Sequence, residues 1–181
     1  MTDNDDNIVE PNKESLWETW WNVQRSIRYH NYRHAFFESY SRVVSGLNIL
    51  LSSAAGASIL KVIETSDAEF AIYLMGGLAV INTMDLVYGT AKRSGQHREL
   101  RNKFIDIEKR YLAGRRKDIV SKQEFYKISE EILSIEAEEP PIYRLLDVYC
   151  HNEMIKAYLP SGEPVKQKWY QVILKNYLRS M

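Results

Sequence analysis

Two long apolar runs in the middle of the chain constrain its fold more than any other feature. They are "VVSGLNILLSSAAGASILKVI" at 43–63 and "FAIYLMGGLAVINTMDLV" at 70–87, joined by the acidic turn "ETSDAE". With a rise of about 1.5 Å per residue, helices of this length match a hydrocarbon layer roughly 30 Å thick. The runs therefore predict a hairpin of two transmembrane helices.

Charges on either side of the runs predict the orientation of the hairpin. The turn between the runs has three acids and no base, whereas bases precede the first run and follow the second: Arg25, Arg28, Arg33, Arg42, Lys92, Arg93, Arg98, Arg101 and Lys103. Under the positive-inside rule, both termini of such a hairpin would lie in the cytoplasm. A soluble bundle that uses both runs as core helices stays open as the alternative.

Polar residues within the runs are the candidate pore-lining or gating positions. Asn82 and Asp85 are three residues apart and share a helix face. Ionisable groups inside a membrane span usually face a bundle interior or a water-filled path, so they are functional hypotheses by default. Asn48 and Ser52 belong to a thin polar stripe on the first run. The alternatives are that the stripe only packs helices together, and that Asp85 pairs with Lys92 or Arg93 near the interface.

Small residues provide candidate surfaces for close helix packing. Ser52 and Gly56 are four residues apart in the first run, and Gly76 and Gly77 interrupt the second. Helices in a bilayer associate through such small residues, because these allow the backbones to approach closely. Two spans cannot enclose a pore alone, so conduction would require a homo-oligomer.

Further helices are expected around the hairpin, which makes the whole chain all-α. A helix over 14–42 begins with a Ser15–Glu18 capping box, and residues 1–13 form an acidic tail that we expect to be disordered. After the hairpin, the next helix carries an apolar seam at 100–111. A helix that begins with a Ser121–Glu124 box is stopped by Pro140-Pro141. Helices over 142–158 and 164–178 follow.

Composition and motifs argue against several functions. Basic and acidic residues both number 24, which gives no basic excess for nucleic acid, and the single Cys150 excludes an intrachain disulfide. His30 and His34 lack a second ligand cluster, and His151-Asn152-Glu153 cannot converge, because consecutive helical residues point about 100° apart. No P-loop or nucleophile-elbow motif occurs. We expect no enzyme activity, no cofactor and no metal.

The order of segments resembles a known family. The basic, aromatic stretch "WETWWNVQRSIRYHNYR" leads into the hairpin, and "HRELRNKFIDIEKRYL", "EAEEPP" and "LLDVYCHNEMIKAY" follow it. Over roughly residues 15–160 this resembles the SLATT domains, two-transmembrane effectors found beside nucleotide-second-messenger synthases and SLOG sensors in bacterial defence systems.

The resemblance implies an effector domain over 14–160 that is silent until infection and then forms a pore in the inner membrane. Its implied partners are the bilayer, other copies of the chain and a sensor or second-messenger-producing protein. The C-terminal amphipathic helix, within 161–181, lies outside the resemblance. A non-conducting helical adaptor that acts through protein contacts is the alternative function.

Overall fold

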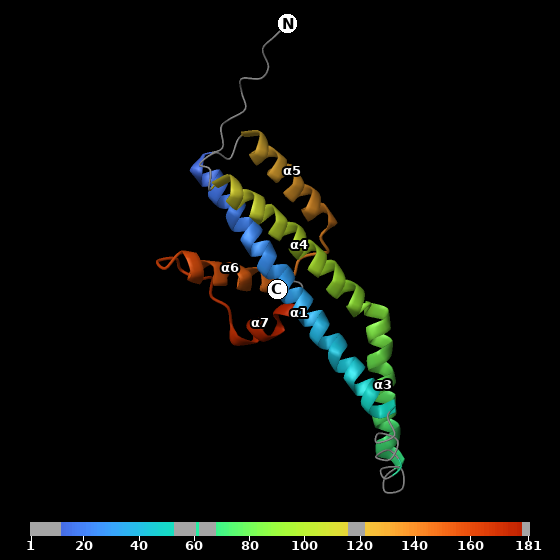
Figure 1. The fold of residues 1–181 in the computed structure, drawn as a ribbon. Helices are drawn as coiled ribbons and strands as arrows, with labels where there is room; N and C mark the ends of the chain where they lie inside the picture. The colour runs from blue at the N-terminus through green and yellow to red at the C-terminus, as the bar shows by residue number, and fades with distance from the viewer. Residues whose placement is uncertain (1–11, 53–60, 62–67, 116–121, 179–181) are drawn as a thin grey trace. The chain divides into compact units, whose positions relative to one another are not determined.

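The computed structural model describes residues 12–52, 61, 68–115 and 122–178, and every regular element in these ranges is a helix (Figure 1). This confirms the all-α prediction. The elements are α1 (Lys13–Ser52), α3 (Ala68–Tyr88), α4 (Thr90–Arg115), α5 (Lys122–Glu138), α6 (Arg144–Tyr158), α7 (Trp169–Ile173) and the short 3-10 helix η1 (Leu174–Asn176).

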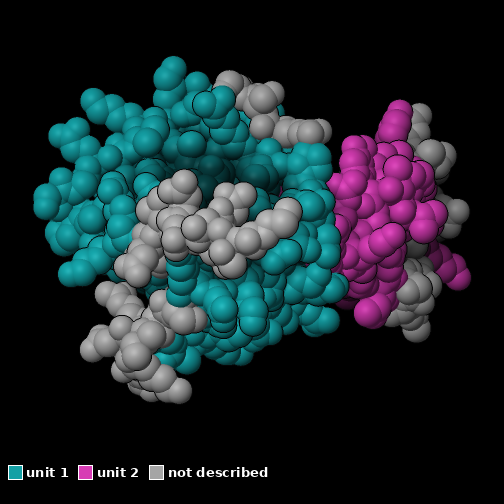
Figure 2. All heavy atoms as spheres, turned by 90° about the horizontal axis from the view of Figure 1, so that it is seen from above, with its two compact units in different colours: residues 1–32, 98–181 teal, residues 33–97 magenta. Residues whose placement is uncertain are grey.

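The chain divides into two compact units, coloured separately in Figure 2. Unit 1 comprises residues 1–32 and 98–181, and unit 2 comprises residues 33–97. The division falls within α1 and α4, so each of these long helices contributes residues to both units.

The start of α1 differs from the prediction. Asn12, rather than Ser15, caps the helix: its Oδ1 accepts the backbone N–H of Ser15 at 2.7 Å. Ser15 lies in the first turn, where its Oγ donates to the Asn12 carbonyl at 3.0 Å. The Asn12 side chain thus accepts a free N–H of the first turn, and the helix begins about one turn before the predicted Ser15–Glu18 box. The helix therefore includes Lys13, which we assigned to the tail.

The core of unit 1 is the apolar seam expected on α4. Leu100, Phe104, Ile107 and Tyr111 are all buried, and they pack with Val23 of α1 and with Ile128 and Ile135 of α5. Three helices thus share one core, as the side-by-side course of α4, α5 and the first part of α1 in Figure 1 indicates. The seam was predicted correctly because its spacing of three and four residues fixes one face of a helix.

The connection from α5 to α6 follows the prediction closely. α5 ends at Glu138, immediately before Glu139 and the Pro140-Pro141 pair, and α6 begins at Arg144. A second, smaller cluster joins Tyr29 of α1 to Leu146 and Cys150 of α6. The Ser121 cap predicted for α5 lies outside the described residues.

The predicted helix over 164–178 is much shorter in the structure. Only Trp169–Ile173 is α-helical, followed by the 3-10 turn Leu174–Asn176. The Asn152 side chain pairs with both the N–H and the carbonyl of Val165, at 2.8 Å each. Lys168, the residue before this helix, has an extended backbone, and its N–H donates to Gln171 Oε1 at 2.8 Å. The α-helix therefore begins at Trp169 rather than at residue 164.

Unit 2 contains the last part of α1, all of α3 and the first part of α4. These helices carry the described parts of the runs predicted at 43–63 and 70–87; residues 53–60 and 62–67 lie outside the described residues. Over residues 12–52, 61, 68–115 and 122–178, no helix has the combined length and apolar character needed to cross a membrane.

Candidate functional site

Two candidate residues from the separate apolar runs meet inside unit 2. Asn48 of α1 and Asn82 of α3 form a reciprocal amide pair, in which each Nδ2 donates to the other's Oδ1 at 2.9 Å. Both residues are half-buried. One amide satisfies the donor and acceptor of the other, so these two polar groups can lie between apolar helices at a low desolvation cost.

Asp85 lies one turn beyond Asn82, next to the junction of α3 and α4. Its carboxylate accepts a hydrogen bond from the Thr90 hydroxyl, and its backbone carbonyl accepts the N–H of Gly89 at 2.9 Å. Gly89 has a φ of +57°, a left-handed conformation that glycine adopts without a steric penalty. Among the described residues, no ion pair joins Asp85 to Lys92 or Arg93. The helix junction, rather than a charge partner, therefore holds this carboxylate.

Two of the remaining candidates, Gly76 and Gly77, are exposed, and a Cβ added at either would meet no described residue within 4 Å. The packing surface predicted at these glycines is thus open among the described residues. Ser52 is the last residue of α1, and Gly56 lies outside the described residues.

Large apolar side chains cover the outside of the hairpin formed by α3 and the end of α1. Leu86 is 83% exposed, Val87 75% and Ile49 69%. We call the full exposed set the hairpin surface: Val43, Leu47, Ile49, Leu50, Tyr73, Met75, Val80, Met84, Leu86, Val87 and Tyr88. Within 43–52 and 70–88 the sequence has one charged residue, Asp85. An apolar surface this continuous marks a site of contact with lipid or protein.

A polar and aromatic layer that the sequence did not indicate lies between α1 and α4 in unit 2. His34 Nδ1 is 2.8 Å from Ser94 Oγ, and the ring of Phe37 stacks on His97 with centroids 5.8 Å apart. The Arg33 guanidinium lies 4.5 Å above the Phe37 ring. These contacts fix α1 against α4 next to the hairpin. No period in the sequence predicts the His34–Ser94 and Phe37–His97 contacts, because each joins residues 60 positions apart.

His30 and His34 do not share a ligand. His30 is buried in unit 1, where its Nε2 lies 2.9 Å from a carboxylate oxygen of Glu139 and its ring stacks on Phe104. Within the described ranges, no three histidine, cysteine, aspartate or glutamate side chains are grouped to hold a metal.

The side chains of His151, Asn152 and Glu153 point to three different neighbours, as we expected for consecutive helical positions. His151 contacts the Trp21 ring edge-on, Asn152 binds Val165, and Glu153 accepts the Tyr32 hydroxyl at 2.7 Å. Burial and this bond raise the pKa of Tyr32 above its ordinary value. Cys150 is fully buried, and burial raises the pKa of its thiol to about 12, so it is no nucleophile at neutral pH.

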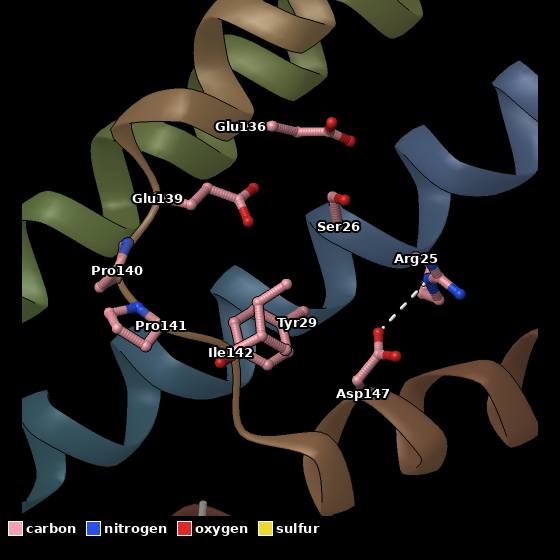
Figure 3. A pocket seen from close by; sticks show the side chains of 9 residues that line it. All are labelled: Arg25, Ser26, Tyr29, Glu136, Glu139, Pro140, Pro141, Ile142 and Asp147. Carbon is pink, nitrogen blue, oxygen red and sulfur yellow. Dashed lines mark ion pairs between the residues drawn. The ribbon is translucent and has the colours of Figure 1, made fainter.

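Unit 1 also contains a half-open pocket of about 390 Å³, shown in Figure 3. Glu136 and Glu139 project into it from one wall, and Arg25 bonds Asp147 at 3.3 Å on the other. Burial, followed by the charge of Glu139, raises the pKa of Glu136. Glu139 contacts His30, and Arg25 pairs with Asp147, so these side chains are already engaged within the fold. The full lining is Arg25, Ser26, Tyr29, Glu136, Glu139, Pro140, Pro141, Ile142 and Asp147.

Comparison of the chain with protein-family models found no matching family, and comparisons with curated proteins and with solved structures found no match either.

Proposed function

We propose that this chain is a bacterial membrane effector whose α1–α3 hairpin enters the inner membrane and assembles with other copies into a pore. The observation that carries the proposal is the inverted polarity of the hairpin. Its outside is the exposed apolar hairpin surface, and its inside holds the Asn48–Asn82 amide pair. Proteins in water bury apolar residues and expose polar ones, whereas a bilayer favours the reverse.

The support comes from this surface rather than from hydropathy, since none of the helices within the described residues meets the requirements of a span. The proposed spans remain 43–63 and 70–87, and they include residues outside the described ranges. Bases on both flanks favour cytoplasmic termini under the positive-inside rule. The resemblance to SLATT domains supports a role in anti-phage defence, with a sensor or second-messenger-producing protein as the trigger.

Assembly is needed because two spans cannot enclose a path for ions. Gly76 and Gly77 supply a surface on α3 where no described residue lies within 4 Å of an added Cβ. A helix from a second copy can approach the α3 backbone closely at such small residues. Asp85, near the cytoplasmic end of the proposed span, would then be repeated around the path and attract cations.

Membrane depolarisation on overexpression, followed with a potential-sensitive dye, tests this function. Gly76→Leu with Gly77→Leu should abolish depolarisation while the protein stays in the membrane fraction, because the added side chains clash only with a second copy. Gly95→Leu is the matched control, since a Cβ there also meets nothing within 4 Å but lies outside the hairpin. Extraction of the parent without detergent, or depolarisation by the double variant equal to the parent's, would contradict the proposal and favour the non-conducting adaptor.

A further inference from the structure

The C-terminal segment 164–178 has an unusual charge and apolar composition. It contains Lys166, Lys168 and Lys175 and no acid. Its large apolar side chains are mostly in solvent: Trp169 is 75% exposed, and the others in the set are Val165, Ile173, Leu174 and Tyr177. A basic segment with exposed aromatic and aliphatic residues has the composition of elements that lie at a membrane–water interface.

Polar contacts hold this segment against α6. Asn152 binds both backbone groups of Val165 at 2.8 Å, and Gln167 Nε2 donates to the Leu145 carbonyl at 2.9 Å. At the other end, Lys175 Nζ lies 3.2 Å from the centroid of the Tyr149 ring and 4.8 Å from that of Tyr32. This is a cation–π arrangement with two aromatic walls.

These contacts use polar side chains of the segment, while Trp169, Ile173 and Tyr177 stay exposed and Val172 is half-buried. Gln167 and Lys175 are partly buried toward α6, whereas Trp169 and Ile173 are exposed. The hydrophobic effect alone would give the opposite arrangement. The fixed backbone therefore presents a preformed apolar surface beside the exposed Lys166 and Lys168.

We propose that Trp169, Ile173 and Tyr177, with Lys166 and Lys168, form a surface that docks on an anionic lipid bilayer. Lysines favour this partner, because each base near an anionic surface contributes attraction while its ammonium stays hydrated. Trp and Tyr favour it as well, since their rings combine an apolar body with a polar tip. A second copy of the chain would instead have to desolvate both lysines, and the segment itself offers no acid to pair with them.

This docking surface is separate from the hairpin and does not depend on pore formation. To test it, the full chain carries an environment-sensitive fluorophore at Ile173→Cys, with Leu133→Cys of α5, 66% exposed, as the matched labelling control. Each is measured with bilayers of phosphatidylcholine alone and of phosphatidylcholine with phosphatidylglycerol. Nanodiscs serve if the chain requires detergent, and preformed vesicles serve if it does not.

The label at 173 should report an apolar environment in the anionic bilayer and much less in the neutral one, while the label at 133 stays unchanged. Lys166→Gln with Lys168→Gln should weaken the anionic effect by about fivefold per lysine. Lys127 and Lys156 are exposed lysines on α5 and α6. Lys127→Gln with Lys156→Gln removes the same charge and should change the response to the anionic bilayer little. An equal signal in both bilayers, or a signal that rises with protein concentration without lipid, would overturn the proposal. A chain that binds anionic bilayers but does not depolarise cells would contradict the proposed pore and leave the docking surface supported.

Discussion

Units 1 and 2 are both built from helices, but they distribute polarity in opposite ways. Unit 1 buries Phe104 and Ile107 and exposes ion pairs such as Lys103 with Glu138. In unit 2, the hairpin surface is apolar and the facing polar groups are amides, Asn48 and Asn82. The core that α1, α4 and α5 share in unit 1 thus has the arrangement that water selects, and we propose that a less polar solvent selects the arrangement of the hairpin.

The contrast shows that helix content alone does not identify the surroundings of a helix. α4 and α3 are both long and regular, but only α4 has an apolar stripe that the rest of the chain covers. The large apolar side chains described on α3 are mostly exposed, and we propose that lipid and neighbouring copies cover them. Matched substitutions in unit 1 and in the hairpin test this difference.

The largest effect is expected in the core of unit 1. Phe104→Ala removes a side chain that is 1% exposed and should lower the free energy of unfolding by about 3–5 kcal/mol, through lost burial and the cavity that remains. Met84→Ala, on the hairpin surface, is the matched variant. It should change the free energy of unfolding in detergent by less than about 1 kcal/mol. Unfolding followed by circular dichroism measures both. Equal losses would show that the hairpin surface is packed within the chain.

The next largest difference should come from a charge placed either on the hairpin surface or on the exposed side of α5. The two charges should differ in their effect on membrane insertion. Val80→Arg puts a charge where the proposed span meets lipid, and it should reduce insertion by about 2.5–3.5 kcal/mol near the bilayer centre. Leu133→Arg makes a similar change on α5 and should leave insertion unchanged. The fraction of each variant in carbonate-washed membranes is the measurement. Indifference to Val80→Arg would mean that this side of α3 faces water.

The Asn48–Asn82 pair should contribute a smaller, measurable coupling. A double-mutant cycle with Asn48→Ala and Asn82→Ala should give an interaction free energy of about 0.6–1.7 kcal/mol, the range for polar pairs between membrane helices. Each single variant leaves one amide without its observed partner, so the double variant should lose less than the sum of the two. Thermal unfolding in detergent supplies the four stabilities. If the two losses in stability simply add, the Asn48 and Asn82 side chains do not interact.

Asp85→Asn should have the smallest effect on stability and a specific effect on transport. The amide can still accept from Thr90, so unfolding should change by no more than about 1 kcal/mol. If the carboxylate attracts cations into the path, conductance or cation preference should fall in reconstituted bilayers. Thr90→Val removes the hydrogen bond and keeps the charge, and it should retain cation preference. Unchanged flux in Asp85→Asn would place the carboxylate outside the path.

The sequence predicted the features that depend on local periodicity. The buried residues from Leu100 to Tyr111 follow helical spacing, and the end of α5 at Pro140-Pro141 follows from the backbone restriction that proline imposes. Asn82 was selected because it shares a helix face with Asp85, and Asn48 because it belongs to a polar stripe on the first run. Their direct contact was not predicted, since the side chains are 34 positions apart and no pattern encodes the register of the two helices.

The errors arose where a side chain competes with a local preference. Asn12 and Ser15 both favour a helix N-terminus, and only the observed hydrogen bond decides between them. The predicted helix at 164–178 had suitable spacing, but the extended backbone of Lys168 and the bond between its N–H and the Gln171 side chain start the helix at Trp169. The layer of His34, Ser94, Phe37 and His97 depends on how α1 meets α4, which residue spacing does not specify.

The most direct test of the inverted hairpin is the accessibility of spin labels at its surface. Labels at Met75→Cys and Val80→Cys are compared with one at Leu133→Cys in isolated membranes. Cys150 does not compete, because its side chain is fully buried. We expect labels at 75 and 80 to collide with oxygen, which dissolves in lipid, and to be shielded from a water-soluble nickel complex, with the reverse at 133. Labels at 75 and 80 that collide mainly with nickel would contradict the account.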